Sequence, residues 1–294
     1  MKTNNGSSRA YSITSILILI ILAILFLFPL YWILTGALKT PAAINSAVPQ
    51  WWPQEFTLRN FEVLFSKRSA PLFEIGSLTG PIIPGAIRWL INTVFMAVLA
   101  MLLTCITASL AGYALAKKRF AGRVILFSLI VAAMALPKQV ILIPLIKEMS
   151  ALGLYDNLWA VILPTVGWPF GVFLMKQFAE SIPGEMLEAA RIDGAGELRT
   201  FITVVYPMIK PGVGALAIFT FISSWNDYFL QLIMLTSSSN LTISLGIATM
   251  QAENSTDYGL IMAGAALAAV PIIIVFLIFQ KYFTKGITMG AVKG

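Results

Sequence analysis

The chain has 294 residues, of which 58% are hydrophobic and 11% are charged, whereas a soluble globular domain is roughly 25% charged. This composition excludes a water-soluble domain, and because only helices and closed barrels can span lipid, the long unbroken apolar runs predict an all-α polytopic membrane protein. The chain has one cysteine and no histidine, which excludes disulfide frameworks and Cys/His metal sites, so no metal is expected. The net charge of +7 is explained by the placement of lysine and arginine in loops, so no nucleic-acid partner is expected either.

Six apolar stretches, each long enough for a membrane-spanning helix, follow one another along the chain. They cover residues 13–38, 90–116, 124–146, 158–176, 213–235 and 260–282. Lys2 and Arg9 precede the first stretch, as in a secretory signal, but its apolar run exceeds the roughly 7 to 15 residues of a signal's hydrophobic region. We therefore expect a retained first helix and six transmembrane helices in all.

The loops between these spans differ in charge. The loop between spans two and three is basic, whereas the loop between spans five and six is acidic and has no basic residue. Because positively charged loops remain in the cytoplasm, this difference predicts that both termini lie on the cytoplasmic side. The residues concerned are Lys117, Lys118, Arg119, Arg123, Glu253 and Asp257.

The long stretch 39–89 is then extracytoplasmic. Its many prolines disfavour a continuous helix, whereas Trp51, Trp52 and Phe56 suit the lipid interface. We expect an external cap with short helical pieces. The whole chain is expected to form a single transmembrane domain, 1–294, with a first helix over 1–38, a five-helix core over 90–282 and a cytoplasmic tail over 283–294.

The loop 177–211, between spans four and five, is the most informative part of the chain. Pro183 suits a helix start, Glu185 favours the positive end of the helix dipole, and Gly194 can adopt the left-handed conformation that ends a helix. These residues predict a short helix over 184–193.

A second short helix is predicted from about Glu197 toward Pro207, so that the loop projects from the membrane. Small side chains let a partner approach the backbone closely, and carboxylates can accept hydrogen bonds from a partner's arginines. The loop is therefore interpreted as a docking knob. Its small residues are Ala189, Ala190 and Ala195, and its acceptors are Glu185, Glu188 and Asp193.

The extended motif in this loop resembles the EAA loop of ATP-binding-cassette (ABC) importer permeases: Glu188-Ala189-Ala190, then Asp193-Gly194-Ala195 and a downstream Pro207. Three other stretches narrow the resemblance to carbohydrate permeases similar to the smaller membrane subunit of the maltose transporter. They are 38–41 with 52–53 and 56–61 in the outer loop, 224–227 in span five and 286–294 at the C-terminus. The chain departs from the family pattern at Tyr206, where leucine is usual, and in a longer outer segment, 66–84.

The resemblance implies a type I importer permease with six transmembrane helices, in the bacterial cytoplasmic (inner) membrane. It implies that residues 185–194 form a coupling helix seated in a cleft of an ATPase subunit, and that Lys293 and Gly294 in the tail contact the same ATPase. The implied assembly contains a second permease subunit, which makes a heterodimer, two ATPase copies and an extracytoplasmic solute-binding protein. Its substrate is expected to be a sugar, an oligosaccharide or a sugar derivative.

Catalytic machinery is missing from the sequence. There is no GxxxxGK[ST] phosphate loop and no Ser/His or Cys/His pair, so no catalytic residue is predicted and the chain is not expected to be an enzyme. No cofactor is expected on this chain, because ATP and magnesium belong to the partner ATPase.

Two ionisable residues interrupt the apolar spans, Lys138 in span three and Asp227 in span five. Each lies 14 residues from the cytoplasmic end of its span, about 21 Å deep in a core of about 30 Å if both helices are straight. Equal depth and opposite charge predict that the two residues line one aqueous pathway and pair when it is closed. Pro137 and Pro144 could interrupt span three near this point.

Neighbouring side chains complete the predicted substrate pathway. Gln139 and Asn226 add neutral hydrogen-bonding groups, and Trp225 and Tyr228 add aromatic faces of the kind that stack on sugar rings. In the alternative interpretation, Lys138 extends to the outer interface and Asp227 only satisfies a neighbouring helix. Rival functions are a carrier driven by an ion gradient, with these charges as coupling groups, and a membrane scaffold that transports nothing.

Overall fold

The computed structural model describes residues 5–75, 77–253 and 257–291. The chain forms two compact units, which are described separately: unit 1 within 1–69 and 247–269, and unit 2 within 70–246 and 270–294. The expected organisation as one membrane domain stays a prediction.

Most of the predicted spans appear as long apolar helices. Within the described residues, five helices are long and apolar enough to cross a membrane, and a sixth span results if one bent pair of helices is counted as one. The fold class predicted from composition is therefore confirmed. The five helices are Tyr11–Ala37, Gly85–Lys117, Trp159–Glu180, Glu197–Asn226 and Tyr258–Gln280, and the bent pair is Arg123–Ala133 with Lys138–Ala151.

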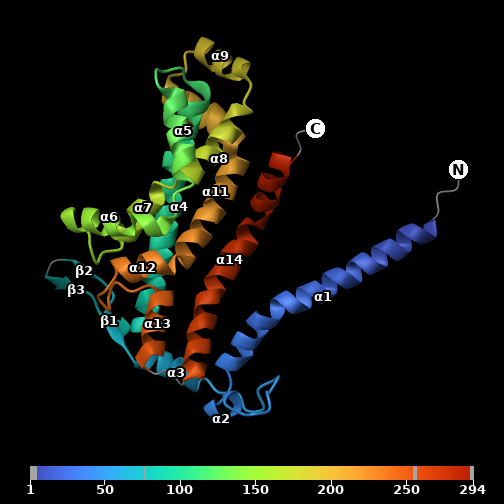
Figure 1. Cartoon of the computed structure of the whole chain (residues 1–294), viewed down its shortest axis with the longest axis vertical. Helices are drawn as coiled ribbons and strands as arrows, with labels where there is room; N and C mark the ends of the chain where they lie inside the picture. Colours follow the sequence, from blue (N-terminus) through green and yellow to red (C-terminus); the bar gives the residue numbers. More distant parts are fainter. Residues whose placement is uncertain (1–4, 76, 254–256, 292–294) are drawn as a thin grey trace. The chain divides into compact units, whose positions relative to one another are not determined.

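Unit 2 is built around the long helix α4 (Gly85–Lys117). Helices α7 (Trp159–Val166), α8 (Pro169–Glu180) and α11 (Tyr206–Asn226) pack along it (Figure 1). Small residues permit this close packing, because in a membrane helix association depends on van der Waals contact between closely approaching backbones. The buried glycine, alanine and serine residues of α4 are Gly85, Ala86, Ala97, Ala100, Ala108, Ser109 and Gly112.

At Gly112, α4 lies close to the backbone of α8. A Cβ atom at this position would lie 2.7 Å from the backbone nitrogen of Lys176 and from the carbonyl carbon of Met175. We expect Gly112→Ala to destabilise the protein by about 1 to 3 kcal/mol, because backbone atoms cannot move aside as a side chain can. Thermal unfolding of the detergent-solubilised protein measures this effect.

Gly184 provides the matched control, since a Cβ atom there meets nothing within 4 Å. Gly184→Ala is expected to leave the unfolding temperature unchanged. Equal unfolding temperatures for Gly112→Ala and the unmodified protein would contradict the packing of α4 against α8.

Span three is not one straight helix. It consists of α5 (Arg123–Ala133) and α6 (Lys138–Ala151), which are bent by 105° relative to each other. Pro137 lacks an N–H donor and its ring clashes with the carbonyl four residues earlier, at Ala133, where α5 ends. The predicted depth of Lys138 in the membrane, which assumed a straight helix, is therefore wrong. The predicted interruption of span three near Pro137 is confirmed.

Span five also breaks inside the predicted segment. Helix α11 ends at Asn226, and α12 (Tyr228–Met234) follows after Asp227, which has φ −77° and ψ 64°. The expected second short helix of the 177–211 loop is not separate: α10 (Glu197–Thr200) passes through a π-helical turn, Phe201–Val205, directly into α11. Two further helices follow, α13 (Ile243–Glu253) and α14 (Tyr258–Ala291).

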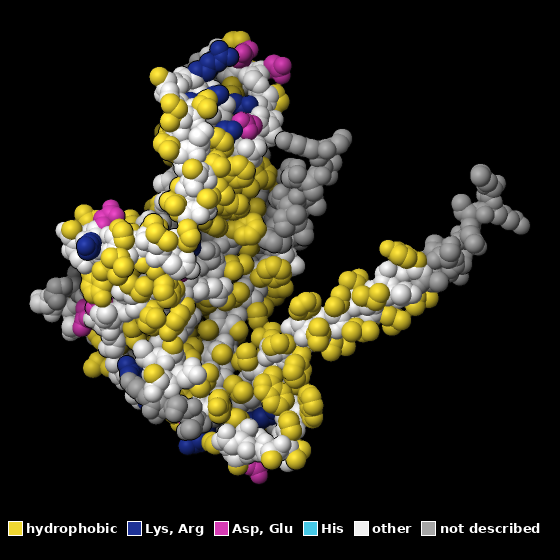
Figure 2. Space-filling model, viewed as in Figure 1, with side chains coloured by type: hydrophobic (Ala, Val, Ile, Leu, Met, Phe, Trp, Pro, Cys, Tyr) yellow, Lys and Arg dark blue, Asp and Glu magenta, His cyan; other side chains and the backbone are white. Residues whose placement is uncertain are grey.

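Unit 1 contains α1 (Asn5–Ala37) and two of the short helical pieces expected in the outer loop, α2 (Pro41–Ile44) and α3 (Arg59–Ser66). Asn60 joins them, because its side-chain amide donates hydrogen bonds of 2.9 Å to the carbonyls of Ala37 and Lys39. From Tyr11 to Phe28, the side chains of α1 are largely exposed within the described structure (Figure 2), which suits a helix surrounded by lipid or by another subunit.

The segment that is longer than usual for the family contains strands, which the sequence analysis did not predict. Strands β1 (Ser69–Pro71) and β4 (Ile82–Pro84) pair, and β2 (Glu74–Ile75) pairs antiparallel with β3 (Leu78–Thr79). Proline is tolerated in such short edge strands, because the proline nitrogen can face away from the paired strand, where no N–H is required for a hydrogen bond. The cap is therefore part helical and part extended.

Candidate functional site

The predicted docking helix is present. Helix α9 (Gly184–Ile192) follows Pro183, which has extended dihedral angles, and lies at one end of unit 2 (Figure 1). Gly194 has φ +74°, the left-handed conformation expected from the sequence. The Ala195 N–H then donates to the Ala190 carbonyl at 2.9 Å, which satisfies a carbonyl at the helix end. Whether this helix contacts an ATPase is not tested by its geometry and stays a prediction.

The side chains of α9 divide into an inward face and an exposed face. Leu187 is 7% exposed and belongs to the hydrophobic core of unit 2, and Ala190 is 8% exposed. Ala190 is therefore mostly covered by its own chain, whereas the small residues of this loop were expected to be open to a partner. The other predicted docking residues are exposed: Glu185, Glu188, Ala189, Asp193 and Gly194.

Large apolar side chains lie exposed beside these docking residues, and the sequence analysis missed them. Ile192 is 86% exposed and Leu198 is 68% exposed, and Met186 is 44% exposed. A polar surface with exposed large apolar residues is typical of a protein interface. Ile192 and Leu198 are six residues apart and lie on either side of the turn at Gly194. This spacing does not match the periodicity of a helix, so the sequence pattern did not indicate that they share a surface.

Two lysine side chains at the end of α4 bind the segments that precede and follow α9. Lys117 Nζ donates to the carbonyl of Glu180 (3.0 Å), the last residue of α8, and to that of Ile182 (2.5 Å), between α8 and α9. Lys118 forms an ion pair with Glu197 at the start of α10. Burial opposes a charge on Lys118, but the hydrogen bonds with Glu197 and Tyr113 outweigh it and raise the pKa of this lysine. These contacts link α9, through its flanking segments, to the central helix.

Away from α9, unit 2 contains a cavity of about 520 Å³ where spans three, four and five are each interrupted. The interruptions are the bend at 134–137, the Gly167-Trp168 junction between α7 and α8, and Asp227 between α11 and α12. Helix breaks at membrane depth are tolerated where the freed backbone lines a cavity or is buried in protein. The polar residues Lys138, Gln139, Thr165, Ser223 and Asp227 contribute to the lining.

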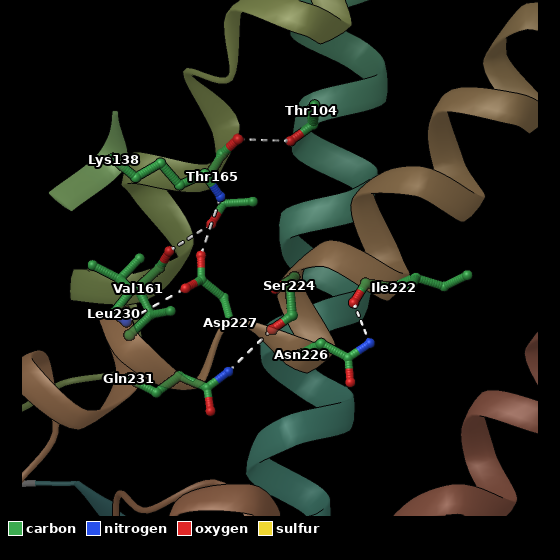
Figure 3. A network of polar contacts seen from close by, with 10 residues as sticks. All are labelled: Thr104, Lys138, Val161, Thr165, Ile222, Ser224, Asn226, Asp227, Leu230 and Gln231. Atoms are coloured by element: carbon green, nitrogen blue, oxygen red, sulfur yellow. Dashed lines mark hydrogen bonds and ion pairs between the residues drawn. The ribbon is translucent and has the colours of Figure 1, made fainter. Parts of the chain in front are cut away.

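Lys138 and Asp227 meet in this cavity as predicted. The distance from Lys138 Nζ to Asp227 Oδ2 is 3.3 Å, and the other carboxylate oxygen accepts a hydrogen bond from the Leu230 N–H at 3.4 Å (Figure 3). The carboxylate therefore caps α12 and pairs with the lysine at once. The side chain of Asp227 is 17% exposed and that of Lys138 is 61% exposed, so the pair is accessible from the lysine side.

A buried glutamine, Gln231, stabilises the interruption between α11 and α12 in span five. Gln231 is fully buried, and its Nε2 donates to the Ser224 carbonyl at 3.0 Å (Figure 3). In a continuous helix this carbonyl would accept from the N–H four residues later. Thr242 donates its hydroxyl to the glutamine oxygen, so both ends of the Gln231 amide are satisfied and Asp227 is kept in position.

Three of the six predicted pathway residues do not line the cavity. Trp225 is 1% exposed and packs on Phe221 with a ring distance of 5.5 Å, so in this conformation it offers no face to a sugar. Asn226 is exposed and donates to the Ile222 carbonyl, and Tyr228 is 38% exposed. The pathway role of all six residues stays a prediction.

The aromatic residues that do line the cavity were missed. They are Trp168, Phe170 and Phe229, and the first two rings lie 4.9 Å apart. Trp168 precedes Pro169, and this pair could have indicated a helix break, because a residue before proline is driven out of the helical conformation. The helix break was not predicted, because the residues around Trp168 form a continuous apolar run that was assigned to one span.

Comparison with known proteins assigns the class. Residues 106–289 match the family described as binding-protein-dependent transport system inner membrane component. The chain is 32% identical over 299 residues to the arabinooligosaccharides transport system permease protein AraQ of Bacillus subtilis (strain 168), covering all of both chains. It is 33% identical to the sulfoquinovosyl glycerol transport system permease protein SmoH of Agrobacterium fabrum, over 91% of this chain and 89% of that one.

Further relatives and solved structures agree. The maltodextrin transport system permease protein MdxG of Bacillus subtilis (strain 168) is 32% identical over 96% of each chain. A bacterial ABC transporter involved in the import of the acidic polysaccharide alginate contains a chain of TM-score 0.77 and 24% identity, with 96% of this chain and 100% of that chain covered. That likeness shows the fold alone, which is the fold of a type I importer permease.

Interrupted apolar helices of spanning length, around a cavity lined by apolar and aromatic side chains with a few polar groups, together with a projecting helix, are the arrangement of a membrane permease. The chain belongs to the family of inner-membrane components of binding-protein-dependent transport systems, the permeases of ABC importers. The resemblance inferred from the EAA motif is thereby confirmed.

Proposed function

We propose that this permease imports a sugar, an oligosaccharide or a sugar derivative, and that it forms half of the translocation pathway. The permeases AraQ, SmoH and MdxG, which are named for transport of such compounds, support this substrate class. The observation that carries the proposal is the cavity at the three helix breaks, where ion-paired side chains lie beside aromatic rings. Sugars are bound by this combination of polar groups and apolar faces.

The proposal includes the orientation and the partners. Both termini and α9 lie in the cytoplasm, where α9 docks on one of two ATPase copies that hold the ATP and magnesium. A second permease subunit supplies the other half of the pathway, and an extracytoplasmic binding protein delivers the substrate. The proposed tail contact through Lys293 and Gly294 lies outside the described residues, and the basic 117–123 loop supports the orientation.

Reconstitution tests this function directly. The complete complex, purified and placed in lipid vesicles with its binding protein outside and ATP inside, is expected to accumulate a labelled oligosaccharide. Uptake is expected to stop without ATP and to persist with an ionophore. Uptake that persists without ATP and is abolished by the ionophore would instead support a carrier driven by an ion gradient.

A further inference from the structure

An open groove lies where α5 begins, and it shares no lining residue with the cavity at the helix breaks or with α9. Its volume is about 410 Å³. The lining combines two guanidinium groups with apolar side chains, and it has no acidic residue within the described chain. The lining residues are Arg119, Phe120, Gly122, Arg123, Val124 and Ile125.

The two arginines leave an uncompensated positive charge in this groove. Arg119 is exposed and makes no hydrogen bond or ion pair within the part of the chain that the structure describes. Arg123 donates one hydrogen bond, of 3.1 Å, to the Lys118 carbonyl, which leaves further N–H groups of its guanidinium free. Glu197 pairs with the neighbouring Lys118 and not with either arginine. The groove is therefore suited to an anion.

The apolar lining indicates what kind of anion fits. Val124 is 71% exposed, Ile125 is 67% exposed and Phe120 is 44% exposed. Helix α5, which continues from the groove, has no buried residue within the described structure, and it is part of a membrane span. The groove thus lies at the junction of the polar end of unit 2 with its apolar helices, and Figure 2 shows basic side chains gathered at that end.

We propose that this groove binds an anionic phospholipid, with its phosphate between Arg119 and Arg123 and its acyl chains along Val124 and Ile125. Arginine matches the geometry of phosphate with paired hydrogen bonds, and the cytoplasmic leaflet supplies anionic lipids. A free phosphate ion would use the arginines but not the apolar lining, and an ATPase surface could not reach the exposed side chains of a membrane span. The proposal rests on the cytoplasmic orientation given above.

Lipid retention by the purified complex tests the site. Native mass spectrometry after incubation with equal amounts of phosphatidylglycerol and phosphatidylcholine is expected to show preferential retention of phosphatidylglycerol. Arg119→Gln with Arg123→Gln should reduce that preference by about 30-fold. Arg119→Gln alone, which removes no internal contact, should account for about a fivefold reduction. Arg199→Gln, which removes an exposed arginine outside the groove, should change nothing.

The remaining arms separate the possible ligands. Excess inorganic phosphate should not displace the lipid, and displacement at equal concentration would show a simple anion site and overturn the proposal. Unchanged lipid preference in the double variant, with loss of the ATPase from the complex, would overturn it in favour of a protein contact. Because retention is measured without transport, an inactive complex that still selects phosphatidylglycerol would refute the proposed function and leave the lipid site standing.

Discussion

Replacing Glu188 by lysine is expected to reduce ATP-driven uptake at least tenfold while the subunit still folds and inserts in the membrane. Glu188 is exposed on α9, and within the described chain its side chain makes no hydrogen bond or ion pair. The change therefore removes no internal contact. If α9 is seated in an ATPase cleft, a reversed charge meets a surface complementary to the original carboxylate, which typically costs several kcal/mol.

Two measurements distinguish lost docking from lost folding. Thermal unfolding of Glu188→Lys should match that of the unmodified protein, whereas co-purification of the ATPase should fall together with uptake. Glu62→Lys is the matched control, because Glu62 is an exposed glutamate on α3, and it should leave ATPase association unchanged. Normal uptake by Glu188→Lys would refute the docking role of α9.

Removing the carboxylate of Asp227 is expected to have the second large effect. In Asp227→Ala the ammonium of Lys138 loses its partner at 3.3 Å, and α12 loses the oxygen that caps it at Leu230. Loss of an N-cap costs about 0.5 to 2 kcal/mol, and the ion pair contributes less than a buried one because Lys138 is 61% exposed. Uptake should fall about tenfold or more, with altered selectivity among sugars.

A double variant separates the charge pair from the cap. Asp227→Asn can still cap α12, and combined with Lys138→Met it leaves no unpaired charge at the cavity. If the pair acts only in structure, the double variant should recover both the stability and the transport lost in Lys138→Met. If the pair lines the substrate route, as proposed, stability should recover while transport stays low, because the charged lining is gone. The control Asn226→Ala removes only a side chain bonded to its own helix, at the Ile222 carbonyl.

Transport kinetics decide the outcome for the pathway. Uptake by Asp227→Ala with unchanged rate and selectivity, in an assembled complex, would show that the cavity is not on the route of the substrate. Asn226 is not among the residues that line the cavity, so a strong defect in Asn226→Ala alone would point instead to a pathway on the exposed side of α11.

The sequence by itself was sufficient for the features that depend on local chemistry. Apolar runs of spanning length predict helices because lipid leaves the backbone no other partner, and five long helices with one bent pair correspond to the six predicted spans. Helix α9 and the left-handed Gly194 were also predictable, because proline at a helix start and glycine after its end act within a few residues. The EAA motif lies in this local segment.

Only the tertiary structure decided which side chains meet. Lys138 and Asp227 are partners as predicted, but through a 105° bend rather than through equal depth in two straight helices. Trp225 faces the core, whereas Trp168 lines the cavity. In a span that is apolar on all sides, hydrophobic periodicity does not distinguish the face toward a cavity from the face toward a neighbouring helix. That choice depends on helix packing and on where prolines and buried amides such as Gln231 interrupt the helices, which one sequence does not specify.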